Sequence, residues 1–116
     1  MEKLLIANRG EIAIRIGQTA SELGYSTIAV FPEDDANSLH VKQSDEAVQI
    51  PGAGAQAYLN IEAIINVAKI CGADAIHPGY GFLSENPDFA KACEDADITF
   101  VGPTAAQLSI FGNKAG

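Results

Sequence analysis

Short apolar runs alternate with helix-forming stretches along this chain, and this alternation strongly limits the folds open to it. Each run is four to six residues long and rich in branched side chains, which is typical of buried strands. Strands that are apolar on both faces have to be covered on both faces, as in a parallel sheet with helices on either side. The predicted strands are 3–7, 26–31, 46–50, 73–76 and 98–101.

The segments between these strands have the apolar spacing of amphipathic helices. Ala13, Ile16, Ala20 and Leu23 fall on one helical face, and Gly24 is a typical end for that helix. Asparagine, a preferred N-cap residue, precedes two of the later helices, at positions 60 and 86. The predicted helices are 11–23, a short turn at 38–42, 61–71, 87–96 and one that begins near Thr104.

Right-handed crossovers are strongly favoured between parallel strands, and they lead us to expect the strand order 3-2-1-4-5. The predicted fold class is therefore α/β, a five-stranded parallel, Rossmann-like sheet with helices on both faces. In this order the first and fourth strands are neighbours. The loops that follow them, 8–11 and 77–86, would meet at the crevice where such sheets bind ligands.

The second of these loops has an unusual composition. The run HPGYGFLSEN, from His77 to Asn86, combines two glycines, a proline, an aromatic ring, a hydroxyl and a carboxylate. Glycine allows a close approach of the backbone to a bound group, and Pro78 restricts the conformations of the loop. A simple turn needs few of these residues, so we expect this decapeptide to contact a ligand.

Charge and composition exclude several classes of protein. The formal net charge is −8, with basic residues scattered singly, which argues against a nucleic-acid partner. No stretch has the length and apolarity of a membrane span. Cys71 and Cys93 lack metal-ligand spacing and His40 and His77 are isolated, so we expect no metal site and two reduced cysteines in a cytoplasmic compartment.

Two basic residues have more than one interpretation. Arg9 follows the first strand, where a dinucleotide fold would carry GxGxxG, but most of those glycines are missing. Arg9 either forms an ion pair with a carboxylate in a tight turn or provides an orienting charge at a domain junction. Lys114 follows the last predicted helix, where a lysine either complements the helix dipole or has a functional role.

Several motifs, in order and over nearly the whole chain, closely resemble the opening of biotin carboxylase, the component shared by acetyl-CoA, propionyl-CoA and pyruvate carboxylases. They are IANRGEIA at 6–13, YLN at 58–60, the decapeptide at 77–86, FVGP at 100–103 and GNK at 112–114. The resemblance implies that 1–102 form the N-terminal, pre-ATP-grasp domain and that 103–116 lead into the ATP-grasp domain. It also implies a ligase that uses MgATP and bicarbonate to carboxylate biotin.

The resemblance assigns roles to individual residues. Lys114 matches the family's first ATP-binding lysine, and Tyr80 and Gly81 match the part of the loop that lies against biotin. Arg15 and Glu22 match part of a homodimer surface, although Gln18 stands where members often carry a basic residue. The Mg²⁺ ligands and the catalytic arginine lie beyond residue 116 in the family. We therefore expect no catalytic residue in this chain and no activity from the chain alone.

The implied partners are the ATP-grasp and C-terminal domains of the same enzyme, a biotin carboxyl carrier and a carboxyltransferase. Two alternatives remain at this point. One is the corresponding domain of another ATP-grasp ligase, such as carbamoyl-phosphate synthetase, which shares the fold but not the HPGYGFLSEN run. The other is a flavodoxin-like binding module without chemistry, although the acidic pocket of receiver domains is replaced here by Asn8 and Arg9.

Overall fold

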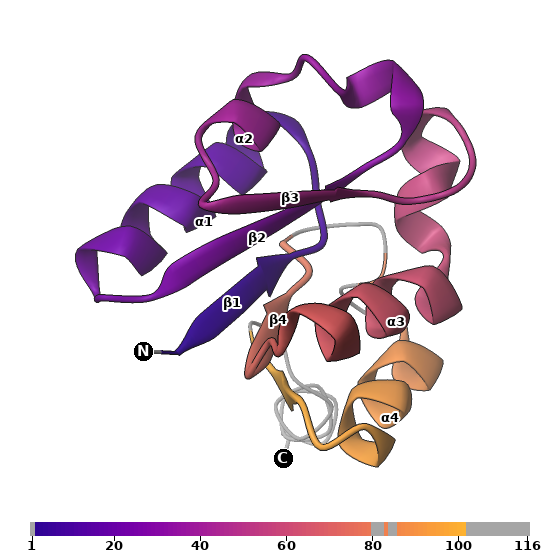
Figure 1. Ribbon diagram of the computed structural model, residues 1–116. Coiled ribbons are helices and arrows are strands. Elements are labelled where there is room, and N and C mark those ends of the chain that lie inside the picture. The colour runs from indigo at the N-terminus through magenta and orange to yellow at the C-terminus, as the bar shows by residue number, and fades with distance from the viewer. Residues whose placement is uncertain (1, 80–82, 84–85, 102–116) are drawn as a thin grey trace, which may run out of the picture.

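The computed structural model describes residues 2–79, 83 and 86–101, which form a five-stranded, all-parallel sheet flanked by helices (Figure 1). The sheet order is β3-β2-β1-β4-β5. This result confirms the predicted fold class and strand order. The strands are β1 (Lys3–Ile6), β2 (Ser26–Phe31), β3 (Glu46–Gln49), β4 (Ala75–His77) and β5 (Thr99–Phe100).

Four α-helices and two 3₁₀ helices connect these strands in the described residues. The predicted N-caps are confirmed: Asn60 accepts a hydrogen bond from the amide of Ala63, and Asn86 accepts from the amides of Asp88 and Phe89. The helices are α1 (Gly10–Glu22), η1 (Glu33–Asp35), α2 (Leu39–Lys42), η2 (Gly54–Leu59), α3 (Ile61–Cys71) and α4 (Pro87–Asp95).

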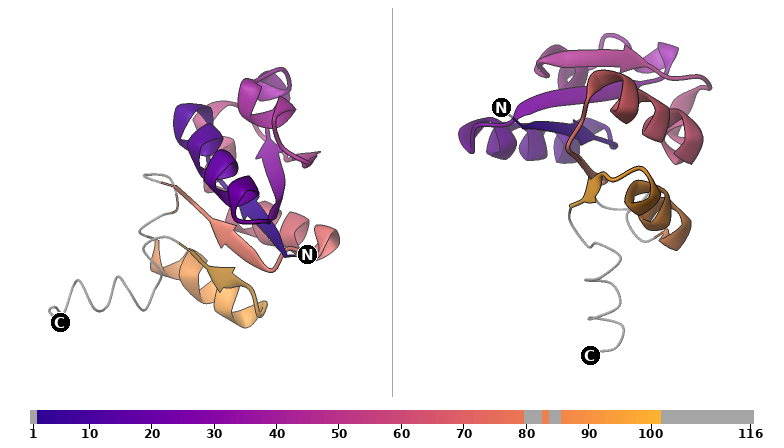
Figure 2. Two further views of the ribbon diagram at one scale, coloured as in Figure 1. Left: turned by 90° about the vertical axis from the view of Figure 1, so that its left-hand side faces the viewer. Right: turned by 60° about the horizontal axis from the view of Figure 1, so that its bottom comes forward.

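The sheet separates two apolar clusters, because alternate side chains of each strand point to opposite faces. Leu5 and Ile28 belong to the larger cluster, which α3 and α4 cover. Leu4 and Ile6 belong to the smaller cluster beneath α1. Figures 1 and 2 show α3 and α4 on the side of the sheet away from α1 and α2, as a sheet covered on both faces requires.

Two local features differ from the sequence expectation. Leu23, predicted on the buried face of the first helix, is 72 % exposed because it is the C-cap residue and lines an open pocket. The segment Gly54–Leu59, for which no helix was predicted, forms η2 and buries Tyr58 completely. The helix predicted from Thr104 lies outside the described residues.

The described helices are all too short, or not apolar enough, to cross a membrane. Cys71 and Cys93 are both free thiols, as expected. Cys93 is buried in α4, and this burial raises the pKa of its thiol to about 12. A thiol with so high a pKa is almost entirely protonated at neutral pH, so Cys93 acts as a packing residue.

Candidate functional site at the carboxyl end of the sheet

The loops after β1 and β4 are joined directly at the carboxyl end of the sheet. The amide of Ala7 donates a hydrogen bond to the carbonyl of His77 at 2.9 Å, which continues the pairing of the two strands. One residue further on, the side-chain Nδ2 of Asn8 donates to the carbonyl of Pro78 at 2.6 Å. The two loops therefore meet at the strand switch point, as the predicted topology requires.

Asn8 is almost completely buried, with 2 % of its surface exposed. While Nδ2 donates to Pro78, Oδ1 accepts a hydrogen bond from the amide of Arg9 at 2.7 Å. A buried amide that lost these partners would keep its desolvation cost without compensation. The side chain of Asn8 therefore holds both loops in one arrangement.

Gly79 approaches Asn8 so closely that no side chain fits at this position. Its φ angle is +70°, in the left-handed region that favours glycine. A Cβ atom at Gly79 would lie 2.6 Å from Nδ2 of Asn8 and 2.9 Å from Cγ2 of Ile12. The first glycine of the decapeptide is thus required by both its backbone conformation and its contact with Asn8.

His77 stabilises the same turn from the end of β4. Its Nδ1 accepts a hydrogen bond from the amide of Gly79 at 3.0 Å. Burial lowers the pKa of the imidazole below its usual 6.5, so the ring is neutral at pH 7. With Nδ1 as an acceptor, Nε2 carries the proton of the neutral ring.

Arg9 forms an ion pair with a carboxylate, as one of its two interpretations predicted. Its Nη2 atom lies 2.6 Å from Oδ1 of Asp35, which follows β2 in η1. The carboxylate is buried, whereas the Arg9 side chain is 38 % exposed. Its guanidinium carbon also lies 5.8 Å from the ring centroid of Tyr58, which is within the range of a cation–π contact. The role of Arg9 at a domain junction stays a prediction.

A buried polar chain extends from Asp35 through Tyr58 to His40. The hydroxyl of Tyr58 donates to Oδ2 of Asp35 at 2.9 Å and lies 3.2 Å from Nε2 of His40. Burial, reinforced by the hydrogen bond to Asp35, raises the pKa of Tyr58, so its hydroxyl stays protonated. Since that proton points to Asp35, the donor between His40 and Tyr58 is Nε2–H.

The remaining nitrogen of His40, Nδ1, is buried and has no hydrogen-bond partner among the described residues. His40 is only 4 % exposed, and this burial lowers the pKa of its imidazole. Neutral His40, protonated Tyr58 and the Arg9–Asp35 ion pair form one buried network. This network fixes the loops that follow β1, β2 and β3 relative to one another.

The sequence predicted that Arg9 could pair with a carboxylate. It identified neither Asp35 as that carboxylate nor the link from Asp35 to Tyr58 and His40. The acidic run 33–35 offered three candidate carboxylates with no pattern to separate them. The directly bonded pairs of this network are 18 to 26 positions apart, and its members come from four different loops or helices. Only the tertiary structure brings them together.

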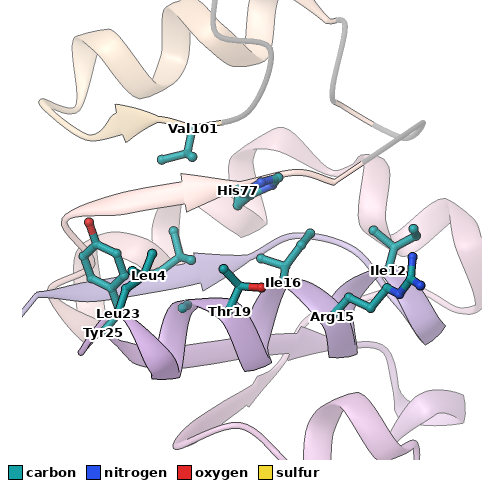
Figure 3. Close-up of a pocket in the computed structure, with 10 residues that line it drawn as sticks. Leu4, Ile12, Arg15, Ile16, Thr19, Leu23, Tyr25, His77 and Val101 are labelled. Carbon is teal, nitrogen blue, oxygen red and sulfur yellow. The ribbon is translucent and has the colours of Figure 1, made fainter.

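A pocket of about 420 Å³ lies between α1, the strands β1 and β4, and Val101, which directly follows β5 (Figure 3). Figure 3 shows His77 and Val101 on one side of it and Ile12, Ile16 and Thr19 of α1 on the other. The lining is mainly apolar, and its ionisable side chains are Arg15, Tyr25 and His77. Such a surface is suited to packing against another apolar segment rather than to acid–base chemistry.

The residues assigned by resemblance are placed only in part. Tyr80, Gly81 and Lys114 lie outside the described residues. Arg15 and Glu22 are both exposed on α1, two turns apart on the same face, and Arg15 lies 3.6 Å from Glu11 in a surface ion pair. The homodimer role of Arg15 and Glu22 stays a prediction.

Across the part of the chain that the structure describes, no group of three or more His, Cys, Asp or Glu side chains could hold a metal ion. The described part of the site therefore consists of a buried hydrogen-bond network, a glycine turn and a half-exposed arginine. These features orient loops rather than activate a nucleophile. The fold and the site define an α/β domain whose loops after β1 and β4 meet at the strand switch point.

Comparison with known proteins identifies the family. Residues 1–108 match the model of the biotin carboxylase N-terminal domain, and the chain belongs to this family. It is 56 % identical over 115 residues to biotin carboxylase 1 of Bacillus subtilis, covering 98 % of this chain and 26 % of that protein. The chain thus spans about a quarter of the length of this relative.

Solved structures agree with this assignment. The biotin carboxylase domain of a single-chain bacterial carboxylase is 52 % identical, with a TM-score of 0.90 over 99 % of this chain and 27 % of that one. The biotin carboxylase domain dimer of the Hydrogenobacter thermophilus 2-oxoglutarate carboxylase, in complex with MgADP, ADP and bicarbonate, is 50 % identical. Its TM-score is 0.85 over 89 % of this chain and 23 % of that one.

Proposed function

We propose that this chain is the N-terminal domain of a biotin-dependent carboxylase and takes part in the ATP- and bicarbonate-dependent carboxylation of biotin. The match of residues 1–108 to the biotin carboxylase N-terminal domain carries the proposal. The MgADP and bicarbonate bound to the Hydrogenobacter relative support ATP, Mg²⁺ and bicarbonate as reactants of the complete enzyme. The alternatives of a carbamoyl-phosphate synthetase domain or a module without chemistry have no comparable support.

In this proposal the domain contributes binding groups rather than catalytic ones. The ring of Tyr80 and the backbone of Gly81 lie against biotin, and Lys114 contacts the phosphates of ATP. The turn at Pro78 and Gly79, held by Asn8, supports a close backbone approach at the start of this loop. The same family resemblance places the ligands of Mg²⁺ in the ATP-grasp domain, beyond residue 116.

The proposed partners follow from the same family. The ATP-grasp and C-terminal domains complete the enzyme, and a biotin carboxyl carrier and a carboxyltransferase use its product. The exposed positions of Arg15 and Glu22 on α1 support a homodimer surface, as does the dimer of the Hydrogenobacter relative. The free thiols of Cys71 and Cys93 support a reducing, cytoplasmic compartment.

A chimera tests the proposal. This chain replaces the matching quarter of the Bacillus subtilis biotin carboxylase, and biotin-dependent ATP cleavage is measured with bicarbonate present. We expect activity in the chimera and none in the truncated host. A second chimera, with the matching region of the Haemophilus influenzae biotin carboxylase, controls for the domain exchange itself. Activity in that control but not with this chain would contradict the proposed function.

A further inference from the structure

We propose that Asn8 is a positioning residue for biotin: it fixes Pro78 and Gly79, and through them the residues that follow in the loop. This inference rests on the proposed function, in which Tyr80 and Gly81 lie against biotin. Asn8 itself does not need to touch the substrate. In this inference, Asn8 acts on biotin binding indirectly, by fixing the backbone of Pro78 and Gly79.

The first step of the argument is the rigidity of the support. Asn8 directly follows the central strand β1, which pairs with β2 on one side and with β4 on the other. Its amide group is buried and is satisfied at both ends, by Pro78 and by Arg9. A side chain held in this way has one conformation, so it can fix a loop to the sheet with little freedom.

The second step is the contact with Gly79. The glycine lies so close to Nδ2 of Asn8 that a Cβ atom would stand 2.6 Å away. The turn is therefore constrained from three sides, by the hydrogen bond from Asn8 to Pro78, by the close packing of Gly79, and by His77, which accepts from the amide of Gly79. These contacts fix the conformation of the turn up to Gly79, the residue directly before Tyr80 in the sequence.

The third step is the effect on binding. A binding group that is displaced by about 1 Å can lower the reaction rate by up to about a hundredfold, even when the displaced group keeps its chemistry. Loss of Asn8 should therefore weaken the use of biotin while ATP, which contacts other parts of the enzyme, is bound as before. A residue that only stabilised the fold would not separate the two substrates in this way.

The test uses the active chimera with free biotin as the probe. Asn8→Ala removes the hydrogen bond to the carbonyl of Pro78 and the one from the amide of Arg9. Asn8→Asp keeps an acceptor for the Arg9 amide but places a second acceptor opposite the carbonyl of Pro78. We expect each to raise the KM for biotin at least about tenfold and to leave the KM for ATP within about twofold. The matched control is Asn60→Ala, which removes a helix N-cap far along the chain and lowers Tm without changing the KM for biotin.

Gly79→Ala tests the same contact from the loop side. It provides the test if the Asn8 variants do not fold. It should raise the KM for biotin similarly, and the double variant Asn8→Ala, Gly79→Ala should show less than the product of the two single effects. An unchanged KM for biotin in folded Asn8 variants, or in folded Gly79→Ala, would overturn the inference. A chimera that is inactive before any substitution would instead contradict the proposed function.

Discussion

The hydroxyl of Tyr58 lies 2.9 Å from Oδ2 of Asp35, although 23 residues separate the two positions in the chain. Asp35 follows β2 and Tyr58 lies in the segment after β3, so this hydrogen bond joins two loops at the carboxyl end of the sheet. Arg9 binds the other oxygen of the same carboxylate, at 2.6 Å. One buried carboxylate thus connects three loops, and its removal should loosen the contacts between all three.

Asp35→Asn tests how much this carboxylate contributes to the stability of the fold. The amide keeps the shape of the side chain but loses the negative charge that Arg9 and Tyr58 both face. We expect the free energy of unfolding to fall by about 1.5–3 kcal/mol, the range for hydrogen bonds to charged groups. Urea denaturation followed by circular dichroism gives the value. Glu33→Gln, at an exposed neighbouring position, should change it by less than about 0.5 kcal/mol, and equal effects of the two substitutions would refute the expectation.

The stability of the chain should also depend on pH through the buried His40 and the half-buried His77. Burial lowers the pKa values of His40 and His77 in the folded state below the ordinary value of 6.5. Below pH 6.5 the unfolded chain therefore binds more protons than the folded chain, so the free energy of unfolding falls as the pH falls. The slope is at most about 1.4 kcal/mol per pH unit for each histidine.

His40→Gln separates the two contributions. Urea denaturation between pH 7.5 and 5.5 should show a shallower pH dependence in the variant, because only His77 still contributes in this window. The absolute stability of His40→Gln at pH 7.5 is not the criterion, since the network with Tyr58 is altered at every pH. A slope as steep as that of the unmodified chain would show that His40 is not held neutral by the fold.

The topology of this protein could be predicted from its sequence because each element carries its own local signal. The β-branched run of β2 and the helix α3 both have their predicted bounds, and Asn60 is the N-cap of α3 as expected. The prediction was less accurate at the strand ends: β4 was expected at 73–76 and lies at Ala75–His77. Strand ends depend on pairing with neighbours, which a local pattern does not contain.

The candidate site was predictable in its location but not in its contacts. The switch point follows from strand order alone, so the meeting of Asn8 with Pro78 could be expected as a meeting of loops. The network of Arg9, Asp35, Tyr58 and His40 could not be predicted, because its members share no spacing or motif. Tyr58 in particular was recognised only as part of a family motif. No pattern in the sequence indicated that it is completely buried against Asp35.

Lys114→Gln in the chimera tests the proposed contact with ATP. A lysine at a helix end contributes only a few tenths of a kcal/mol, so that role predicts a small drop in Tm and unchanged kinetics. A phosphate contact predicts a loss of roughly 2 kcal/mol in apparent ATP binding, or about a thirtyfold higher KM for ATP. Lys91→Gln, at an exposed position of α4, is the matched control and should leave the KM for ATP unchanged. An unchanged KM in a folded Lys114→Gln chimera would exclude the phosphate contact.

The 116-residue chain alone should fold and yet neither hydrolyse ATP nor carboxylate biotin. Its sheet is covered by helices on both faces and its helices carry their own caps, whereas the proposed site needs groups from other domains. A ligand raises Tm only if it binds the folded state. Thermal denaturation with and without millimolar MgATP should therefore give the same Tm, and a clear upward shift would mean that a nucleotide site is complete within these residues.

The close approach of Gly79 to Asn8 also has an evolutionary consequence. A Cβ atom at position 79 would meet the side chains of both Asn8 and Ile12, so three positions from two distant parts of the sequence share one small volume. Relatives that carry any residue other than glycine at position 79 should also carry a smaller residue at 8 and at 12. Substitutions at these three positions would then occur together in a lineage. A smaller residue at 8 or 12 would have to appear before glycine at 79 could be replaced.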